Sequence, residues 1–495
     1  MGARTGIIAL ALALAWPGAA AAADEPPPVL TTHSIVIAGH RLTYTAEAGR
    51  IPIRDVATGA PIGYSFYTAY RLPKRGEHRP LTFLWNGGPG LPAASVEFEG
   101  FGPRRIEQGK LVDNEDTALT DSDLVFVDPI GTGFSRAVSD NAQVAFTSIV
   151  GDVAAATEFV RVFVLRHGDE DTPLIVSGQS YGAGRAGSAG YELLKRGLKL
   201  RGIVLVSNSE GLPHYPDQER IAAAIHVGDY AVAALYYHKL PAELGTTPAT
   251  ARAGAERWAR DVYIPAVLHR ETLGASRREA IATELAKRTG LPASEIDRET
   301  LLITQGYFLG HLVPGKQPYY SDYRIIEPHH SPALDPGVRS IRHELGYPSD
   351  LPYLGVEPIE NGFAPGGVYP KSVNATWRHT TIYGATDADL AAAEAAFAQK
   401  DIIGAGHFGP DLPGAAAAIA LDPRVRVMVM HGAYDPLGGC SIDAELFRHL
   451  TGHDRDAIRF HCYLAGHAIY RDAPARAAYA ADLRAFARTI AGDNE

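Results

Sequence analysis

A serine between two glycines is the feature of this 495-residue sequence with the clearest chemical potential. Residues 178–182 read Gly-Gln-Ser-Tyr-Gly, directly after an apolar run at 174–177 and at the start of a helix predicted over 180–196. This pattern between a strand and a helix is typical of a nucleophile elbow, whose strained turn lifts the serine hydroxyl out of the sheet. An ordinary glycine-bounded turn is the competing interpretation, and the flanking elements favour the elbow. We therefore predict that Ser180 is a nucleophile.

A serine nucleophile needs a base, and the base needs a carboxylate to orient it. In strand-and-helix hydrolases these residues follow the serine in the order acid, then histidine. Asp435 comes after the apolar run at 425–430, and His467 comes after the run at 460–464. Both stand just beyond the C-terminal end of a predicted strand, where catalytic residues of α/β proteins gather. We expect Asp435 and His467 to complete a triad with Ser180.

Four nearby residues compete for these two roles. Asp422 precedes its strand, Asp443 lies inside the following predicted helix, and His461 lies within its own strand. His431 is at the correct edge but stands before the turn. We interpret His431 as a neighbour of the triad at most.

Acyl transfer also needs hydrogen-bond donors for the oxyanion. The backbone N–H of Tyr181, directly after the serine, supplies one. Residues 86–90 read Asn-Gly-Gly-Pro-Gly after the apolar run at 81–85, and adjacent glycines leave an amide accessible for the second. A phosphate-binding loop is the alternative, but neither Lys-Ser/Thr nor the start of a helix follows.

Strands and helices that could position these residues alternate along the chain. Residues 33–45 and 50–70 alternate apolar and polar side chains, which is typical of antiparallel strands. Shorter apolar runs follow, and such runs between helices indicate a mainly parallel sheet buried on both faces. The runs lie at 81–85, 123–128, 174–177, 202–206 and 425–430, and the clearest helices are predicted at 149–167, 180–196, 415–421 and 441–450.

The middle of the chain lacks this rhythm. Residues 217–240, 250–271 and 277–289 have helical patterns, and a Pro-, Tyr- and His-rich stretch follows. We interpret the region as an insertion over the active edge of the sheet. His329 and His330 beside Glu327 have no matching third metal ligand, so we expect a solvated loop there and no metal. The expected organisation is a signal peptide at 1–23, a first core segment at 24–207, a cap insertion at 208–384 and a second core segment at 385–495.

The N-terminus predicts export. Arg4, a short apolar stretch and a run of small residues before Asp24 form the pattern of a secretory signal peptide. A retained N-terminal anchor is the alternative, but the apolar stretch is too short to span a bilayer. We expect a periplasmic or secreted protein with no integral membrane segment after signal removal.

Charge and cysteine content bear on the binding partners and on possible disulfides. The net charge is −10, without a basic run, which argues against a nucleic-acid partner. Export permits disulfides, and the chain has two cysteines, Cys440 and Cys462, both near the predicted catalytic segments. Either one bridge or two buried free thiols fits, and we favour the free thiols because a chain this long has core enough without a crosslink.

Six ordered motifs resemble the serine carboxypeptidase family, and the bacterial branch most closely. The resemblance spans roughly residues 75–475 and implies an α/β-hydrolase fold: a mainly parallel central sheet with helices on both faces and a helical cap insertion. It also implies a Ser180, Asp435 and His467 triad, an oxyanion hole from Gly88 and Tyr181, and no cofactor. The motifs lie at residues 86–90, 101–103, 128–135, 178–182, 431–435 and 465–467.

Substrate recognition is where the sequence departs from this family. The family binds the free C-terminal carboxylate of a peptide through the Asn of the first motif and a Glu just before the serine. Asn86 matches, whereas Gln179 replaces the Glu, and Leu91-Pro92 replaces small polar residues. A glutamine amide donates a hydrogen bond at any pH, whereas a glutamate donates only when protonated. Gln179 therefore either preserves carboxylate binding without the pH dependence, which we favour, or marks a site for esters or amides.

Three functions follow in order of preference. The first is a carboxypeptidase that releases C-terminal residues from peptides through an acyl-enzyme on Ser180. The second is an esterase or acyltransferase with the same triad, and the third is a non-catalytic binding protein on a hydrolase scaffold. The complete set of Ser, Asp, His and oxyanion segments argues against the third.

Overall fold

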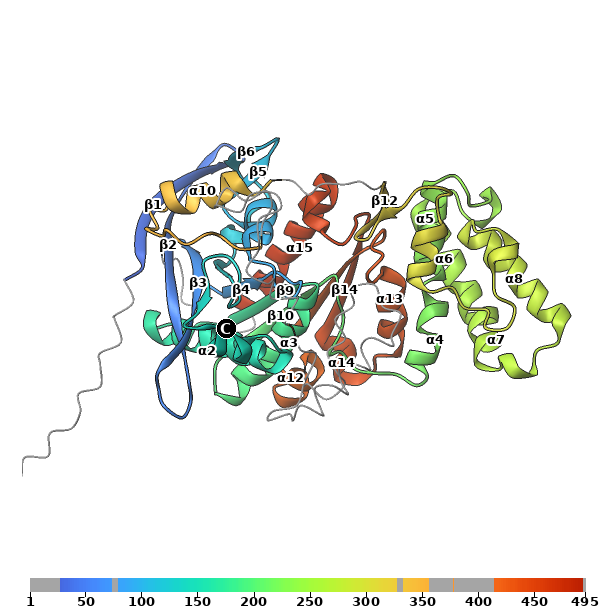
Figure 1. Cartoon of the computed structure of the whole chain (residues 1–495), viewed down its shortest axis with the longest axis horizontal. Coiled ribbons are helices and arrows are strands. Elements are labelled where there is room, and N and C mark those ends of the chain that lie inside the picture. The colour runs from blue at the N-terminus through green and yellow to red at the C-terminus, as the bar shows by residue number, and fades with distance from the viewer. Residues whose placement is uncertain (1–26, 74–78, 327–332, 356–376, 378–413, 493–495) are drawn as a thin grey trace, which may run out of the picture.

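The computed structural model describes residues 27–73, 79–326, 333–355, 377 and 414–492, and one large mixed sheet runs through its centre (Figure 1). In the described chain the strand order is β1-β2-β3-β7-β4-β9-β10-β13-β14, with β8 beside β3. The first three strands and the β3–β7 pair are antiparallel, and every pair from β7 to β14 is parallel. The strands are β1 (Val29–Ile37), β2 (His40–Arg54), β3 (Pro61–Arg71), β4 (Leu81–Trp85), β7 (Asp123–Val127), β8 (Arg136–Ala137), β9 (Leu174–Gln179), β10 (Leu200–Val206), β13 (Arg426–Gly432) and β14 (Ile458–Tyr463).

Side chains alternate along the central strands between two separate hydrophobic clusters. Phe83 of β4 and Val427 of β13 belong to the first cluster, whereas their neighbours Leu84 and Met428 belong to the second. Because successive side chains of a strand point to opposite faces, the sheet is buried on both sides. This confirms the expected mainly parallel sheet with apolar runs as its central strands.

Helices cover both faces of the sheet. Residues of α2, α3 and α12 join the first cluster, and residues of α15 join the second. All four helices predicted for the core lie within one residue of their expected bounds. The core helices are α2 (Ile149–His167), α3 (Tyr181–Lys195), α12 (Ala415–Leu421), α13 (Cys440–His449), α14 (Gly452–Ala457) and α15 (Ala473–Gly492).

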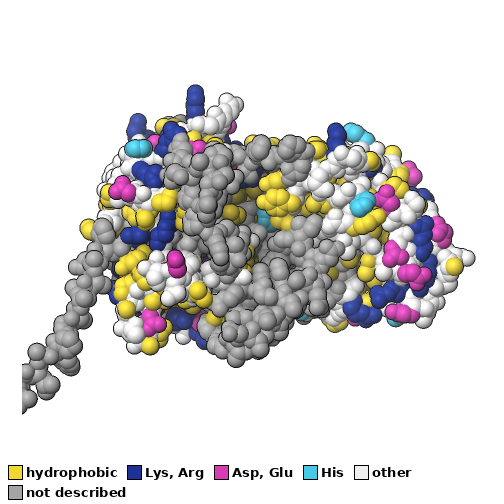
Figure 2. Space-filling model, viewed as in Figure 1, with side chains coloured by type: hydrophobic (Ala, Val, Ile, Leu, Met, Phe, Trp, Pro, Cys, Tyr) yellow, Lys and Arg dark blue, Asp and Glu magenta, His cyan; other side chains and the backbone are white. Residues whose placement is uncertain are grey.

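A group of helices projects beyond the β14 edge of the sheet, at the right of Figure 1. Acidic and basic side chains mingle on its outer surface in Figure 2. Lys287 pairs with Glu284, and Arg298 pairs with Glu279. The helices are α4 (Gln218–Ile225), α5 (Val227–Tyr236), α6 (Pro248–Trp258), α7 (Ile264–Leu268), α8 (Ala275–Thr289) and α9 (Gln305–His311), and a hairpin of β11 (Pro318–Tyr319) and β12 (Asp322–Ile326) follows.

Helix α10 (Asp335–His343) lies elsewhere. Val338 and Ile341 on its buried face join the second core cluster, and the helix contacts the small sheet of β5 (Arg104–Glu107) and β6 (Lys110–Asp113). In Figure 1 it lies at the opposite end of the molecule from α4–α8. The interpretation of residues 208–384 as one covering insertion is therefore too simple, because this part returns to the core. The apolar side chains on one face of α10 pack into the second core cluster.

Several expectations concern residues outside the described ranges. They are the signal peptide at 1–23, the loop with His329 and His330, and the boundary at 384. In the ranges that are described, no helix has the length and apolar character needed to cross a membrane.

Candidate active site

Ser180 occupies a strained turn between β9 and α3. Its backbone has φ 58° and ψ −129°, a conformation that L-residues rarely adopt, and Ser180 is partly exposed while its two chain neighbours are buried. A Cβ on Gly178 would overlap the carbonyl oxygen of Gly182. A Cβ on Gly182 would lie 2.5 Å from the carbonyl oxygen of Asn86. These contacts explain the two glycines, and the turn has the geometry of a nucleophile elbow.

Asp435 and His467 meet beyond the ends of β13 and β14. Nδ1 of His467 lies 2.8 Å from Oδ2 of Asp435, which is fully buried. The other carboxylate oxygen of Asp435 accepts a hydrogen bond from the amide of Leu437 at 2.9 Å. A buried carboxylate with these donors can hold the imidazole in one tautomer, with Nε2 as the basic nitrogen.

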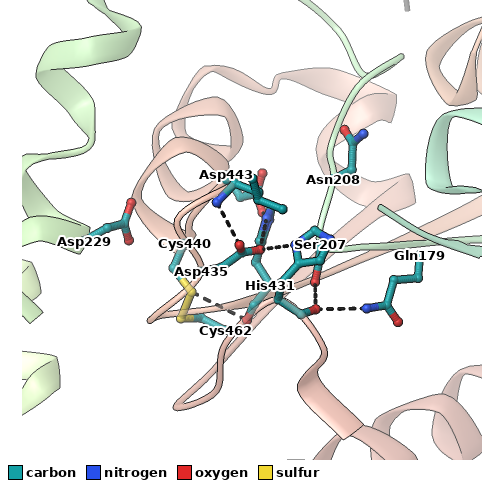
Figure 3. A network of polar contacts seen from close by, with 12 residues as sticks. Gln179, Ser207, Asn208, Asp229, His431, Asp435, Cys440, Asp443 and Cys462 are labelled. Carbon is teal, nitrogen blue, oxygen red and sulfur yellow. Dashed lines mark hydrogen bonds and ion pairs between the residues drawn. A yellow bond between two sulfur atoms is a disulfide. The ribbon is translucent and has the colours of Figure 1, made fainter. Parts of the chain in front are cut away.

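The loop of His467 is attached directly to the nucleophile strand (Figure 3). The carbonyl oxygen of His467 accepts hydrogen bonds from Nε2 of Gln179 at 3.0 Å and from Oγ of Ser207 at 2.7 Å. The amide of Ser180, next to Gln179, donates to the carbonyl of Val206, next to Ser207. The structure thus brings Ser180, Asp435 and His467 to the carboxyl edge of β9, β10, β13 and β14.

The β11–β12 hairpin closes over the two loops from the other side. The amide of His467 donates to the carbonyl of Ser321 at 2.8 Å, and the amide of Tyr323 donates to the carbonyl of Tyr434 at 3.0 Å. Each triad loop is therefore fixed by backbone hydrogen bonds to the same hairpin.

The loop at 86–90 lies against the elbow. A Cβ on Gly87 would lie 2.8 Å from Cβ of Ser180 and 2.9 Å from the amide nitrogen of Tyr181, so only glycine fits there. The next residue, Gly88, has a φ of +107°. Tyr181 is the first residue of α3, where the helix dipole favours negative charge. The backbone of Gly87 thus lies against Ser180 and Tyr181, and Gly88 is the next residue of the same loop. The oxyanion hole from Gly88 and Tyr181 stays a prediction.

A buried ion pair holds this loop in place. Nε of Arg185 lies 2.6 Å from Oδ2 of Asp152, and Nη1 of Arg185 donates to the carbonyl of Asn86 at 2.7 Å. The hydroxyl of Tyr181 donates to the same carboxylate at 3.0 Å. Sequence analysis did not identify these residues, although an arginine within a helix of small residues was a signal that could have.

The side-chain amides of Asn86 and Gln179 make hydrogen bonds inside the protein. Both N–H groups of Asn86 are engaged, one with the carbonyl of Pro92 at 3.2 Å and one with Oγ of Ser95 at 2.8 Å, and the side chain is buried. Gln179 is buried too, and its Nε2 donates to His467. Asn86 therefore has both of its N–H groups engaged and Gln179 has one of its two, and their role as donors to a substrate carboxylate stays a prediction. The family pattern identified these positions, but the direction of an amide depends on neighbours that the pattern does not contain.

The competing acids and histidines have other partners. Asp422 pairs with Arg424, and His461 pairs with Asp482. His431 and Asp443 pair with each other, with Nδ1 of His431 2.5 Å from Oδ2 of Asp443. These two are buried beside Asp435, so His431 is the neighbour of the triad that the sequence indicated.

Cys440 and Cys462 form a disulfide, which corrects the preference for free thiols. The bridge joins the start of α13, which follows the Asp435 loop, to β14, which leads to His467. Each cysteine lies five residues from its catalytic neighbour along the chain, which is the sequence signal for the pairing. The size of the core was the wrong criterion, since the crosslink aligns two loops and its position does not depend on how much core the fold has.

In the described part of the chain, no three His, Cys, Asp or Glu side chains are grouped so that they could hold a metal ion. The groups gathered around Ser180 are those of acyl transfer: a hydroxyl on a strained turn, a carboxylate-oriented imidazole and backbone amides.

Comparison with known proteins agrees with this chemistry. Residues 57–195 match the family model described as serine carboxypeptidase, and this segment contains the loop at 86–90 and Ser180. The pheromone-processing carboxypeptidase KEX1 of Candida glabrata is 28% identical over 115 residues, which are 22% of this chain and 15% of that protein. The crystal structure of the prohormone-processing carboxypeptidase KEX1(delta)p of Saccharomyces cerevisiae superposes with a TM-score of 0.50 at 13% identity, covering 90% of this chain and 91% of that one. Residues 57–195 are therefore similar to the serine carboxypeptidase family, and the chain has the α/β-hydrolase fold.

Proposed function

We propose that this protein is a serine carboxypeptidase that releases C-terminal residues from peptides through an acyl-enzyme on Ser180. One observation carries the proposal. His467 is held by the buried carboxylate of Asp435 on one side, and its backbone is bonded to Gln179, the residue before the serine, on the other. A simpler turn would serve the fold equally well, so we attribute the oriented histidine and the strained serine to catalysis.

In the proposed reaction, Nε2 of His467 removes the proton of the Ser180 hydroxyl as its oxygen attacks the scissile carbonyl. Asp435 keeps Nδ1 protonated and stabilises the imidazolium that forms. The amides of Gly88 and Tyr181 donate to the oxyanion. His467 then protonates the leaving amine, and water hydrolyses the acyl-enzyme by the same steps in reverse.

A second candidate is an esterase or acyltransferase with the same triad. It is favoured by the hydrogen bonds of Asn86 and Gln179, whose amides are used within the protein. Because both N–H groups of Asn86 and one of Gln179 are already engaged, the site has fewer donors with which to select a free carboxylate. Water and an alcohol compete for the same acyl-enzyme, so the chemistry at Ser180 is unchanged.

We also propose that the mature protein is exported after removal of residues 1–23, and that residues from 208 onward include a helical cap. The disulfide between Cys440 and Cys462 supports export, because disulfides persist in oxidising compartments. The position of α4–α9 beyond the β14 edge supports the cap.

The test compares the wild type with Ser180→Ala on an N-blocked dipeptide and on its C-terminal amide. We expect the wild type to prefer the free acid and to react with a fluorophosphonate probe. Loss of the nucleophile should reduce kcat by several powers of ten and abolish labelling. Undiminished turnover in the variant would refute the nucleophile. Equal rates on acid and amide would refute the carboxypeptidase and favour the second candidate.

A further inference from the structure

Two histidines contact one oxygen of the catalytic acid. Oδ2 of Asp435 lies 2.8 Å from Nδ1 of His467 and 3.6 Å from Nε2 of His431. The other ring nitrogen of His431 lies 2.5 Å from Oδ2 of Asp443. The four side chains therefore form a row in the order Asp443, His431, Asp435, His467, and only His467 is partly exposed. Figure 3 shows His431 and Asp443 beside Asp435.

With both carboxylates ionised, the row favours a protonated His431. A neutral imidazole has one N–H and one lone pair. If that N–H faced Asp443, the lone pair at Nε2 would face the carboxylate of Asp435, and the reverse tautomer would repel Asp443. An imidazolium presents an N–H to both carboxylates. The backbone of Gly438 packs against this ring, because a Cβ on Gly438 would overlap Nε2 of His431.

The other groups around the ring favour the cation as well. Asp229 of α5 adds a third carboxylate from the helical region. On β14 the residue paired with His431 is Cys462, which is in the disulfide and does not titrate. On the other neighbouring strand, β10, Val206 pairs with Met430, and the next residue, Ser207, has no titratable side chain. Burial lowers the pKa of His431, but the carboxylates of Asp443, Asp435 and Asp229 outweigh it and raise the pKa from its ordinary 6.5 to about 9. The charge is therefore fully present below pH 6.5 and is lost as the pH rises through about 9.

We propose that His431 is a positioning residue of the triad, an imidazolium that orients the Asp435 carboxylate and weakens its attraction for a proton on His467. This role rests on the proposed function, in which His467 is the general base. The base must be neutral to act, so a cation behind Asp435 keeps the enzyme active at lower pH than a triad without it.

The size of the effect follows from the spacing. Both rings contact the same oxygen, so their nearest nitrogens lie within about 6 Å of each other, and a unit charge at that distance shifts a titration by about one pH unit once screening and the neutralisation of Asp443 are included.

The experiment measures kcat/KM against pH for the wild type and for His431→Gln. The glutamine amide is uncharged, so the acid limb of the kcat/KM profile should move up by about one pH unit. The value of kcat/KM on the plateau should fall less than its value on the acid limb. His461→Gln is the matched control, because it removes a histidine from another His–Asp pair on the neighbouring strand. The control should leave the acid limb in place. An acid limb of His431→Gln that stays in place or moves down would overturn the proposal.

Two further readouts keep the result unambiguous. The pH dependence of fluorophosphonate labelling at Ser180 also requires a neutral His467, so it tests His431 even if no peptide is hydrolysed. Absence of labelling at every pH would instead refute the proposed function. If His431→Gln does not fold, ¹⁵N NMR of histidine-labelled wild type replaces it. A doubly protonated buried histidine that persists to pH 8 is expected, and its absence would overturn the inference.

Discussion

Replacing Gln179 by glutamate tests how the nucleophile strand and the base are coupled. Nε2 of Gln179 donates to the carbonyl oxygen of His467 at 3.0 Å, inside the protein. A glutamate in this place can make that bond only when it is protonated. When ionised, it would direct a buried negative charge at a carbonyl oxygen, and burial disfavours that charge.

The magnitude can be worked from this contact. A lost neutral hydrogen bond costs about 1 kcal/mol, and an unpaired buried polar group costs about as much again or more, so Gln179→Glu should lose about 2 kcal/mol at neutral pH, or about 30-fold in kcat/KM. At acid pH the protonated side chain restores the bond. The optimum should therefore move toward acid, and since the effect passes through His467, it should appear in kcat.

The assay is kcat and KM against pH on a free-acid dipeptide and on its amide. Positioning of His467 predicts the same acid shift on both substrates. Ser207→Ala is the control, because it removes the second donor to the same carbonyl without adding a titrating group. It should cost a few-fold in rate and leave the pH profile unchanged. A shift confined to the free-acid peptide would refute this reasoning, and would show that Gln179 binds the substrate carboxylate.

Two predictions concern stability. Arg185→Met should lower the free energy of unfolding by about 3–5 kcal/mol, because Asp152 would remain buried without its partner, and adding Asp152→Leu should recover part of the loss in urea denaturation. An unchanged midpoint for the single variant would contradict the role of the ion pair. Replacing Cys440 and Cys462 together by serine should cost about 3 kcal/mol, since the bridge closes a loop with a sequence separation of 22. Equal stability of reduced and oxidised wild type would contradict it.

Most of the core could be predicted because local signals agree with the tertiary structure. Helix α2 begins at Ile149 because the hydroxyl of Ser148 accepts a hydrogen bond from the amide of Gly151, and it ends at Gly168, which has a φ of 65°. Its apolar spacing matches the buried face. For such a helix, the capping residues and the apolar spacing in the sequence predict the same bounds and the same buried face that the structure has.

The proximity of Asp435 and His467 was predictable for a different reason. Asp435 and His467 are 32 residues apart, yet each follows an apolar run, and parallel neighbours end at the same edge of a sheet. That reasoning uses only strand ends and chain order. It does not reach the side-chain directions of Asn86 and Gln179, which depend on which backbone carbonyls lie nearby after folding.

The contacts beyond the triad were out of reach because they join segments with no common pattern. The return of α10 to the core depends on an apolar surface formed by β5 and β6, far from it in sequence. The disulfide depends on the start of α13 lying over β14. Neither relation is encoded in the periodicity of one segment.

The segment after Asp435 shows that the projecting helices contribute to the site as well as flanking it. Nε2 of Gln305 on α9 donates to the carbonyl of Gly438 at 3.1 Å, and the carboxylate of Asp229 on α5 accepts from the amide of Ser441 at 3.2 Å. A Cβ on Gly439, whose φ is +152°, would overlap the carboxylate of Asp229, so the backbone at Gly439 packs closely against α5. The position of Asp435 is thus fixed from one side by its own strand and from the other by the helical region. A displacement of α5 would therefore reach the Asp435 carboxylate through a few residues of backbone.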